Sequence, residues 1–382
     1  MKIGINASFV RKPGTGIGQV SINFLKKLSE TKSQHEFVLY LEEPLPRNFK
    51  LPQNFETRIF LPFWKRDDLI RKIWWEKYLL PQKIRQDKCD LFFSLYQCPT
   101  VLPKSIKHIM LIHDIIPKLF PEYLNNFRKK IYQNLIEKST PQADRIITIS
   151  KKTEKDLVQH FAIPGDKITT SYIDVDPLYK KIPSTEKINK VLKKYHLKPG
   201  YILGGVGLDK RKNVDTLIKA YHQLWKNNSS EFKPPKLVVV GKLRPEMAPL
   251  IIDVEKLVTK LNLKKQVKLL GFVPQENMPA LYNQAALFVY PSLYEGFGLP
   301  VLEAINQKTP VLTAKTSSLP EVGRDAILYC NPEDTEEIAR IIKKVLKDKK
   351  LRDVLSVRGI ERAQQFSWEN FVKKFLHLID QI

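Results

Sequence analysis

The chain has 382 residues, of which 43% are hydrophobic and 27% are charged, and its formal net charge is +24. This composition is typical of a folded globular protein, and the length exceeds what one hydrophobic core usually supports, so we expect two domains. No stretch approaches the roughly 20 apolar residues of a membrane span, and residues 1–6 read as a first strand instead of a signal peptide. We therefore expect a cytoplasmic protein.

The positive charge is spread along the chain and is not collected in a tail. Such an excess calls for an anionic partner, which could be nucleic acid, anionic lipid or a phosphorylated substrate. Cys89, Cys98 and Cys330 have no metal-ligand spacing and cannot all pair. That cysteine usage suits a reducing compartment.

The N-terminal pattern predicts a strand over residues 2–10, a glycine-containing loop over 12–18, a helix, and a second strand over 35–41. Glycines after a strand also occur in dinucleotide-binding oxidoreductases. In those proteins the fingerprint begins directly in the strand-to-helix turn, whereas several residues intervene here. Gly16 and Gly18 therefore form either a ligand-contacting loop of another kind or a purely structural turn.

Residues 64–88 mix aromatic and basic side chains. Basic amphipathic helices with aromatic residues can lie in a membrane interface, held by apolar burial and attraction to anionic lipid. Acidic residues dilute the charge, which favours a core helix with a solvated face. Docking to an anionic membrane surface remains the alternative. The apolar face would consist of Leu69, Ile73, Tyr78 and Leu79.

Buried strands are predicted over residues 90–95, 108–116 and 143–150, and Ser150 is placed to cap the helix that follows the third. The second carries His113 and Asp114 near its carboxyl end, where open α/β sheets bind ligands. A lone histidine is more often structural, but this position favours function. We select His113 as a site residue and Asp114 as a secondary candidate.

Residues 172–184 are punctuated by prolines and are predicted to be the interdomain linker. They include Asp174 and Asp176, and an acid-x-acid pair can ligate Mg²⁺ or Mn²⁺. The prolines favour a structural role for both aspartates.

The second half opens with a strand over 201–206, a basic loop over 207–213 and a helix from 214. Arg211 and Lys212 in that loop could clamp a diphosphate or belong to a solvated charge run. Further strands over 236–241 and 266–271, and around 311 and 327, continue the β-α alternation, with helical stretches at 246–262, 333–348 and about 350–380.

Residues 285–303 predict a strand, a loop and a helix that opens at Pro300. Gly296 and Gly298 precede the helix, whose free N–H groups favour a phosphate or diphosphate. Phosphates would repel Glu295 and Glu303, so we expect these carboxylates to hold sugar hydroxyls. Solvated or capping acids are the alternative.

The stretch 291–303, PSLYEGFGLPVLE, resembles the donor-site signature of retaining glycosyltransferases of family 4, and so do residues 309–312, 317–322 and 325–329. The resemblance implies that Glu303 binds the nucleotide ribose, that Glu295 contacts the donor sugar, and that N–H groups near Phe297–Leu299 meet the diphosphate.

Other segments extend the resemblance over nearly the whole chain. It implies that His113 lies beside the donor sugar and that Arg211 and Lys212 bind the donor phosphates. Asp174 departs from the glycine that the family often has in the linker, and Gly207 departs from an arginine that some members carry.

The implied fold class is α/β, the GT-B fold, with two doubly wound Rossmann-like domains facing a central cleft. Residues 1–180 would form the acceptor-side domain and 181–366 the nucleotide-sugar-binding domain. Residues 367–382 would form a final helix that crosses back to the first domain.

The implied function is retaining transfer of a hexose from a nucleotide diphosphate sugar to a hydroxyl of a sugar or lipid-linked sugar acceptor, without metal or cofactor. GDP-mannose is the favoured donor, followed by UDP-sugars. The alternative is a basic protein that binds a membrane surface or nucleic acid without catalysis; it would explain the charge but not the motifs, so no nucleic acid partner is expected. The proposed catalytic residues are His113, Arg211, Lys212 and Glu295, and the proposed donor-binding residues are Gly16, Gly18, Gly296, Phe297, Gly298, Leu299 and Glu303.

Overall fold

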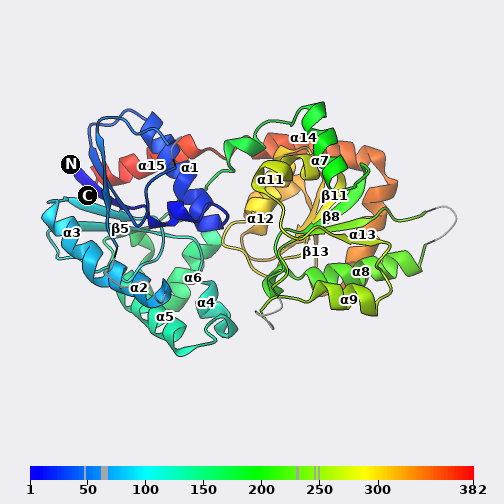
Figure 1. The fold of residues 1–382 in the computed structure, drawn as a ribbon, viewed down its shortest axis with the longest axis horizontal. Coiled ribbons are helices and arrows are strands. Elements are labelled where there is room, and N and C mark those ends of the chain that lie inside the picture. Colours follow the sequence, from blue (N-terminus) through cyan, green and yellow to red (C-terminus); the bar gives the residue numbers. More distant parts are fainter. Residues whose placement is uncertain (47–48, 62–67, 229–231, 245–246, 248–249) are drawn as a thin grey trace. The chain divides into compact units, whose positions relative to one another are not determined.

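The computed structural model describes residues 1–46, 49–61, 68–228, 232–244, 247 and 250–382. The chain divides into two compact units (Figure 1). The first unit comprises Met1–Ile173 and Ser367–Ile382, and the second comprises Asp174–Phe366.

The first unit is built on a seven-stranded parallel sheet with the order β3-β2-β1-β4-β5-β6-β7. Its strands are β1 (Lys2–Asn6), β2 (Glu36–Leu41), β3 (Phe55–Ile59), β4 (Leu91–Ser94), β5 (Lys107–Ile112), β6 (Arg145–Thr148) and β7 (Ile168–Thr170). Its helices are α1 (Gly16–Glu30), α2 (Asp68–Trp74), α3 (Leu80–Gln86), α4 (Ile116–Leu119), α5 (Phe127–Ser139), α6 (Lys151–Phe161) and α15 (Trp368–Asp380), with a π-helical turn at Trp75–Leu79.

The second unit is built on a six-stranded parallel sheet with the order β10-β9-β8-β11-β12-β13. Its strands are β8 (Tyr201–Gly205), β9 (Leu237–Val240), β10 (Val267–Leu269), β11 (Ala285–Tyr290), β12 (Val311–Ala314) and β13 (Leu328–Cys330). Its helices are α7 (Thr185–Lys194), α8 (Val214–Lys226), α9 (Val254–Lys260), α10 (Met278–Asn283), α11 (Leu299–Asn306), α12 (Leu319–Gly323), α13 (Thr335–Lys347) and α14 (Lys349–Ala363).

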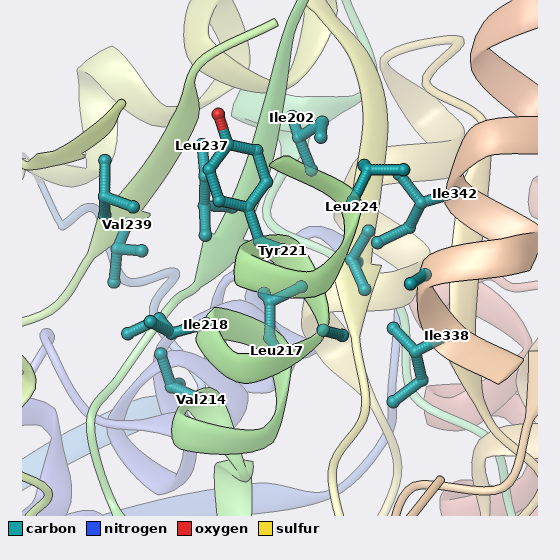
Figure 2. Packing of buried hydrophobic residues seen from close by; sticks show 14 of the residues in the cluster. Ile202, Val214, Leu217, Ile218, Tyr221, Leu224, Leu237, Val239, Ile338 and Ile342 are labelled. Carbon is teal, nitrogen blue, oxygen red and sulfur yellow. The ribbon is translucent and has the colours of Figure 1, made fainter. Parts of the chain in front are cut away.

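The core of the second unit explains why its strands are almost continuously apolar. All four residues of β9 are buried, as expected for a parallel sheet with helices on both faces. Leu217 and Tyr221 of α8 belong to one buried cluster with Leu237 of β9 and Ile338 of α13 (Figure 2). Each such fully buried side chain contributes about 1.5–3 kcal/mol relative to an exposed one.

The C-terminal helix α15 packs on α1 within the first unit. Phe24 of α1 makes edge-to-face ring contacts with Phe371 and Phe375, and Phe375 also stacks on Phe93 of β4. His35 lies 3.1 Å from a carboxylate oxygen of Asp380. The end of the chain is therefore part of the first unit's core.

Several elements differ from the sequence prediction. The first strand ends at Asn6, because Ser8–Arg11 turn into a 3₁₀-helix. The predicted strand over 108–116 ends at Ile112. Strands β3 and β7 were not predicted, since β3 is largely exposed and β7 has three residues. The stretch 350–380 forms two helices, and the division between the units falls between them.

The segment over 64–88 also differs, and its residues 64–67 lie outside the described part of the chain. Tyr78 is exposed, so it does not belong to a buried apolar face of a core helix. The π-helical turn at Trp75–Leu79 changes the angular spacing of the side chains, so that Trp75 and Glu76 point inward instead. Across the described residues, every helix is too short or too polar to cross a lipid bilayer.

Each sheet has one point where the strand order reverses. In the first unit it lies between β1 and β4, and in the second between β8 and β11. Doubly wound sheets bind ligands at this point, beyond the carboxyl ends of the strands. The loops after these four strands are therefore where ligand-binding side chains should gather.

Candidate active site

The loop after β11 enters helix α11 through Gly298. This glycine has φ 114°, a conformation that other residues rarely adopt, and an added Cβ would lie 2.9 Å from a methyl group of Leu319. Helix α11 begins at Leu299, so Pro300 occupies its second position. The Ser318 hydroxyl donates to the carbonyls of Glu295 (2.9 Å) and Phe297 (2.7 Å) and fixes the loop.

Glu295 lies at the centre of the site, and its Oε1 accepts several hydrogen bonds. Lys212 Nζ lies 2.8 Å away and Arg211 Nη1 3.2 Å away. The hydroxyls of Tyr290 and Ser292 each donate at 2.7 Å. Burial by itself would raise the pKa of Glu295, but the two cations and the hydrogen bonds outweigh it and lower the pKa to about 2. Glu295 is therefore ionised at neutral pH.

Arg211 and Lys212 come from the loop after β8, on the other side of the strand reversal. They lie in a short 3₁₀-helix, where Asp209 accepts the Arg211 N–H. Arg211 Nη1 also donates to the carbonyl of Tyr294 at 2.5 Å. Burial lowers the pKa of the Lys212 ammonium, while Glu295 acts in the opposite direction. The alternative of a solvated charge run is therefore excluded, because both side chains are largely buried.

Asn213 joins this basic turn to helix α8. It adopts a left-handed conformation with φ 57°. Its side-chain amide donates to the carbonyls of Pro291 (3.1 Å) and Pro332 (2.7 Å), so it ties the loop after β8 to the loop after β11. These two hydrogen bonds connect the segment that carries the cations to the segment that carries Glu295.

Glu303 lies in helix α11 and has a different environment. Its Oε2 accepts the Tyr282 hydroxyl at 3.0 Å, and its side chain is buried. Burial raises the pKa of Glu303 to about 7, although Tyr282 and Lys212 act against the rise. The pKa values of the two acids of one motif are therefore shifted in opposite directions, that of Glu295 below its ordinary value and that of Glu303 above it.

The predicted site residues of the first unit lie after β1 and β5. His113 follows β5, and its Nε2 lies 2.8 Å from the carbonyl oxygen of Leu95, to which it donates. Burial lowers the pKa of His113, so the ring is neutral at pH 7 and Nδ1 is left as an acceptor. Asp114 accepts the N–H of Ile116 at 2.9 Å.

Gly16 and Gly18 begin helix α1, which Thr15 caps by accepting the Gly18 N–H at 3.1 Å. A Cβ on Gly18 would lie 2.0 Å from the carbonyl oxygen of Lys12, whereas a Cβ on Gly16 would meet nothing within 4 Å. Glycine at position 18 is therefore required by the close approach of the loop. The structure provides no such steric reason at position 16.

Asp174 and Asp176 make local contacts. Asp174 is buried and pairs with Lys180 at 2.7 Å, and Asp176 caps the turn at Pro177–Tyr179 by accepting the N–H of Leu178. These contacts agree with the structural role expected from the prolines. Ser150, also as predicted, caps helix α6.

The sequence analysis did not identify four side chains that hydrogen-bond to Glu295, to Glu303 or to the loop between β11 and α11. These are Tyr282, Tyr290, Ser292 and Ser318. Tyr290 and Ser292 flank Pro291 in the motif, so their position was a usable signal. Tyr282 comes from α10 and Ser318 from the start of α12, and only the fold brings them to Glu303 and to the loop.

Known proteins resemble this chain along its length. The family model described as "Glycosyltransferase Family 4" matches residues 14–177, and "Glycosyl transferases group 1" matches residues 186–362. The O-antigen chain mannosyltransferase B of Escherichia coli is 31% identical over 380 residues, which cover 97% of each chain. The chain belongs to glycosyltransferase family 4.

Other known glycosyltransferases also resemble this chain over most of its length. The O-antigen chain mannosyltransferase RfbU of Salmonella typhimurium is 24% identical over 89% of this chain and 90% of its own. The crystal structure of WaaG, a glycosyltransferase involved in lipopolysaccharide biosynthesis, has a TM-score of 0.75 at 18% identity and 99% coverage of both chains. Anabaena Alr3699/HepE in complex with UDP and glucose has a TM-score of 0.73 at 19% identity and 100% coverage of both. The predicted family and GT-B fold are confirmed.

Proposed function

We propose that this glycosyltransferase transfers a mannosyl residue from a nucleotide diphosphate sugar to a hydroxyl group of a glycan acceptor and retains the anomeric configuration. The observation that carries the proposal is the cluster of Arg211, Lys212 and Glu295 at the strand reversal of the second unit. The mannosyltransferase relative at 31% identity supports mannose as the sugar. GDP-mannose is the favoured donor, and UDP-sugars come next.

The chemistry of the cluster suits a leaving diphosphate. Negative charge develops on the phosphate oxygens as the glycosidic bond breaks, and fixed cations in a water-poor site stabilise it. Arg211 and Lys212 supply that charge, and the N–H groups of Gly296, Phe297, Gly298 and Leu299 at the start of α11 add to it. Fixed cations make a metal ion unnecessary in this scheme. Turnover should therefore be unchanged by EDTA.

The two glutamates are assigned to neutral hydroxyl groups. Glu295 is ionised and already accepts hydroxyl hydrogens from Tyr290 and Ser292, so it can accept those of the donor sugar. Glu303 would accept the ribose hydroxyls, which favours its ionised form. His113 would accept a hydroxyl of the transferred sugar through Nδ1, because Nε2 is committed to Leu95.

We also propose that the enzyme docks on an anionic membrane surface at the inner face of the membrane. Helices α2 and α5 pack together in the first unit and leave large apolar side chains exposed beside basic ones. These side chains are Ile70, Trp74 and Tyr78 from the α2 segment and Phe127 and Ile131 from α5, with Arg128 and Lys130 beside them. Apolar insertion with basic neighbours is the physical basis of interfacial binding.

Flotation with phosphatidylglycerol vesicles at low salt tests the docking. Wild-type protein should float, and the Trp74→Ser/Phe127→Ser double variant should stay in the dense fraction. Val357→Ser is the matched control, because Val357 is 60% exposed but lies on α14 of the second unit. Equal flotation of all three proteins, or of none, would contradict the proposal.

A donor screen tests the transfer reaction. GDP-mannose, UDP-glucose and UDP-N-acetylglucosamine are each incubated with the enzyme and a mannoside acceptor, nucleotide release is followed, and NMR gives the anomeric configuration of the product. We expect turnover of GDP-mannose with retention. Arg211→Ala and Lys212→Ala should lower kcat, whereas Lys210→Ala, an exposed lysine of the same turn, should not. Inversion, full activity of the Lys212 variant, or DNA binding without a response to any nucleotide would overturn the proposal.

A further inference from the structure

Arg362 is a buried charged side chain that the proposed mechanism does not use. It lies in the last turn of α14 and is 5% exposed. A charged group taken out of water is stable only when its polar atoms are hydrogen-bonded. Arg362 Nε donates to the carbonyl of Val322 at 2.9 Å, and Nη2 donates to the carbonyl of Glu321 at 2.5 Å. Both carbonyls belong to α12, so the guanidinium binds the C-terminal end of that helix, where carbonyls lack partners within the helix.

The other end of α12 holds the donor loop, which we define as residues 291–298. Ser317 and Ser318 immediately precede the helix. The Ser317 hydroxyl accepts the N–H of Glu295 at 3.1 Å and donates to the carbonyl of the same residue at 2.5 Å. Ser318 donates to the carbonyl of Phe297 at 2.7 Å. Because α12 has only 5 residues and is about 7.5 Å long, a displacement of its C-terminal end would also displace these serines.

A second path leads from Arg362 to the donor loop through two aromatic rings. The guanidinium carbon lies 4.6 Å from the ring centroid of Phe366, a distance at which a cation and an aromatic ring attract each other. Phe366 meets the ring of Phe297 edge to face, with the two centroids 5.7 Å apart. Both rings are buried. Arg362 therefore supports the main chain of the donor loop through α12 and one of its side chains through Phe366.

Helix α14 gives Arg362 a firm base. At Gly359 this helix approaches α11 so closely that an added Cβ would lie 3.1 Å from the Cβ of Ile305. Helix α11 is the one whose N-terminal N–H groups are proposed to bind the diphosphate. Since α14 contacts α11 directly and binds α12 through Arg362, it joins the two helices that hold the donor loop.

We propose that Arg362 is a positioning residue for donor binding. It acts through α12 and Phe366, which hold the Glu295 main chain and the N–H groups of Phe297 and Leu299 in one arrangement before the donor binds. Fixed dipoles of this kind stabilise a leaving diphosphate because they need no reorganisation during the reaction. The role of these groups toward the donor rests on the proposed function, whereas the effect of Arg362 on the order of the loop does not.

Hydrogen exchange of the full-length protein, without nucleotide, tests the effect on the loop. In Arg362→Met the peptide 291–303 should exchange about tenfold faster than in the wild type, the factor that corresponds to one hydrogen bond from a charged donor. The N–H of Glu295 is the main reporter, because its acceptor is Ser317. Arg358→Met is the matched control, since Arg358 is an exposed arginine one turn earlier on α14. The increase should exceed that of a peptide containing the core strand β9.

Donor kinetics then distinguish positioning from general destabilisation. Arg362→Met should lower kcat/KM for the donor about tenfold and leave the acceptor KM unchanged. Arg362→Lys should recover part of the loss, because an ammonium can still donate to the α12 carbonyls. Leu355→Ala removes a buried side chain of α14 and should lower the Tm without changing either KM. If Arg362→Met does not fold, Phe366→Leu takes its place, with a smaller loss in the same direction.

Faster exchange that is specific to the loop, together with a lower kcat/KM for the donor, is the result that the proposal requires. Equal acceleration in the loop and in β9, or an unchanged kcat/KM for the donor in Arg362→Met, would overturn it. Faster exchange confined to the loop, with no response of the wild-type protein to GDP, UDP or any nucleotide sugar, would count against the proposed function alone.

Discussion

The different environments of Glu295 and Glu303 predict a measurable pH dependence of protein stability. Glu303 has a pKa of about 7 in the folded protein, against an ordinary value of 4.5. A raised carboxyl pKa means that the folded state binds the proton more tightly. This contribution to stability is therefore fully present below about pH 4.5 and is lost as the pH rises through 7.

The magnitude follows from the two pKa values. Between pH 5 and pH 8 the free energy of unfolding should fall by about 2.5 kcal/mol because of this one group. Each pH unit changes that free energy by about 1.4 kcal/mol where the folded state binds one proton more than the unfolded state. Glu303→Gln keeps the shape of the side chain but cannot titrate. Relative to the wild type, its Tm should therefore rise by roughly 5–10 °C from pH 5 to pH 8.

Differential scanning calorimetry of both proteins at pH 5, 6, 7 and 8 measures this difference, and taking the difference cancels the titration of all other groups. The transition that responds should be that of the second unit, which contains Glu303. A Tm difference that stays constant with pH would refute the reasoning. It would mean that the carboxylate is solvated and that Tyr282 does not lie in a dry environment.

Two further changes test the loops that form the sites. Gly18→Ala should destabilise the protein by about 1–3 kcal/mol in urea unfolding, because the new methyl group would overlap a main-chain carbonyl oxygen, whereas Gly16→Ala should be neutral; equal effects would contradict the steric argument. Lys212→Met should cost about 1.5–3 kcal/mol, the value of a hydrogen bond to a charged group, because the buried Glu295 carboxylate loses its nearest cation but keeps Arg211 at 3.2 Å. Lys210→Met is its exposed control, and loss of less than 1 kcal/mol in the Lys212 variant would show that the pair is well solvated.

Local patterns in the sequence were sufficient to predict most of the fold. Buried parallel strands are short apolar runs, so β8, β9 and β11 were predicted within one or two residues. Amphipathic helices such as α8 show their buried face in the spacing of their apolar residues. Strands β3 and β7 lack that signal, because their stability comes from pairing at the two edges of the sheet.

Short contiguous motifs in the sequence were enough to predict the family, the two α/β units and several of the residues that gather at the strand ends of the second unit. The opposite pKa shifts of Glu295 and Glu303 could not be predicted from the motif that contains both residues. That difference depends on side chains from distant segments, which place two cations beside one carboxylate and a tyrosine beside the other. Lys72 is a second example, because its Nζ lies 4.7–4.9 Å from the ring centroids of Phe9, Tyr96 and Tyr132, which come from three other segments of the chain.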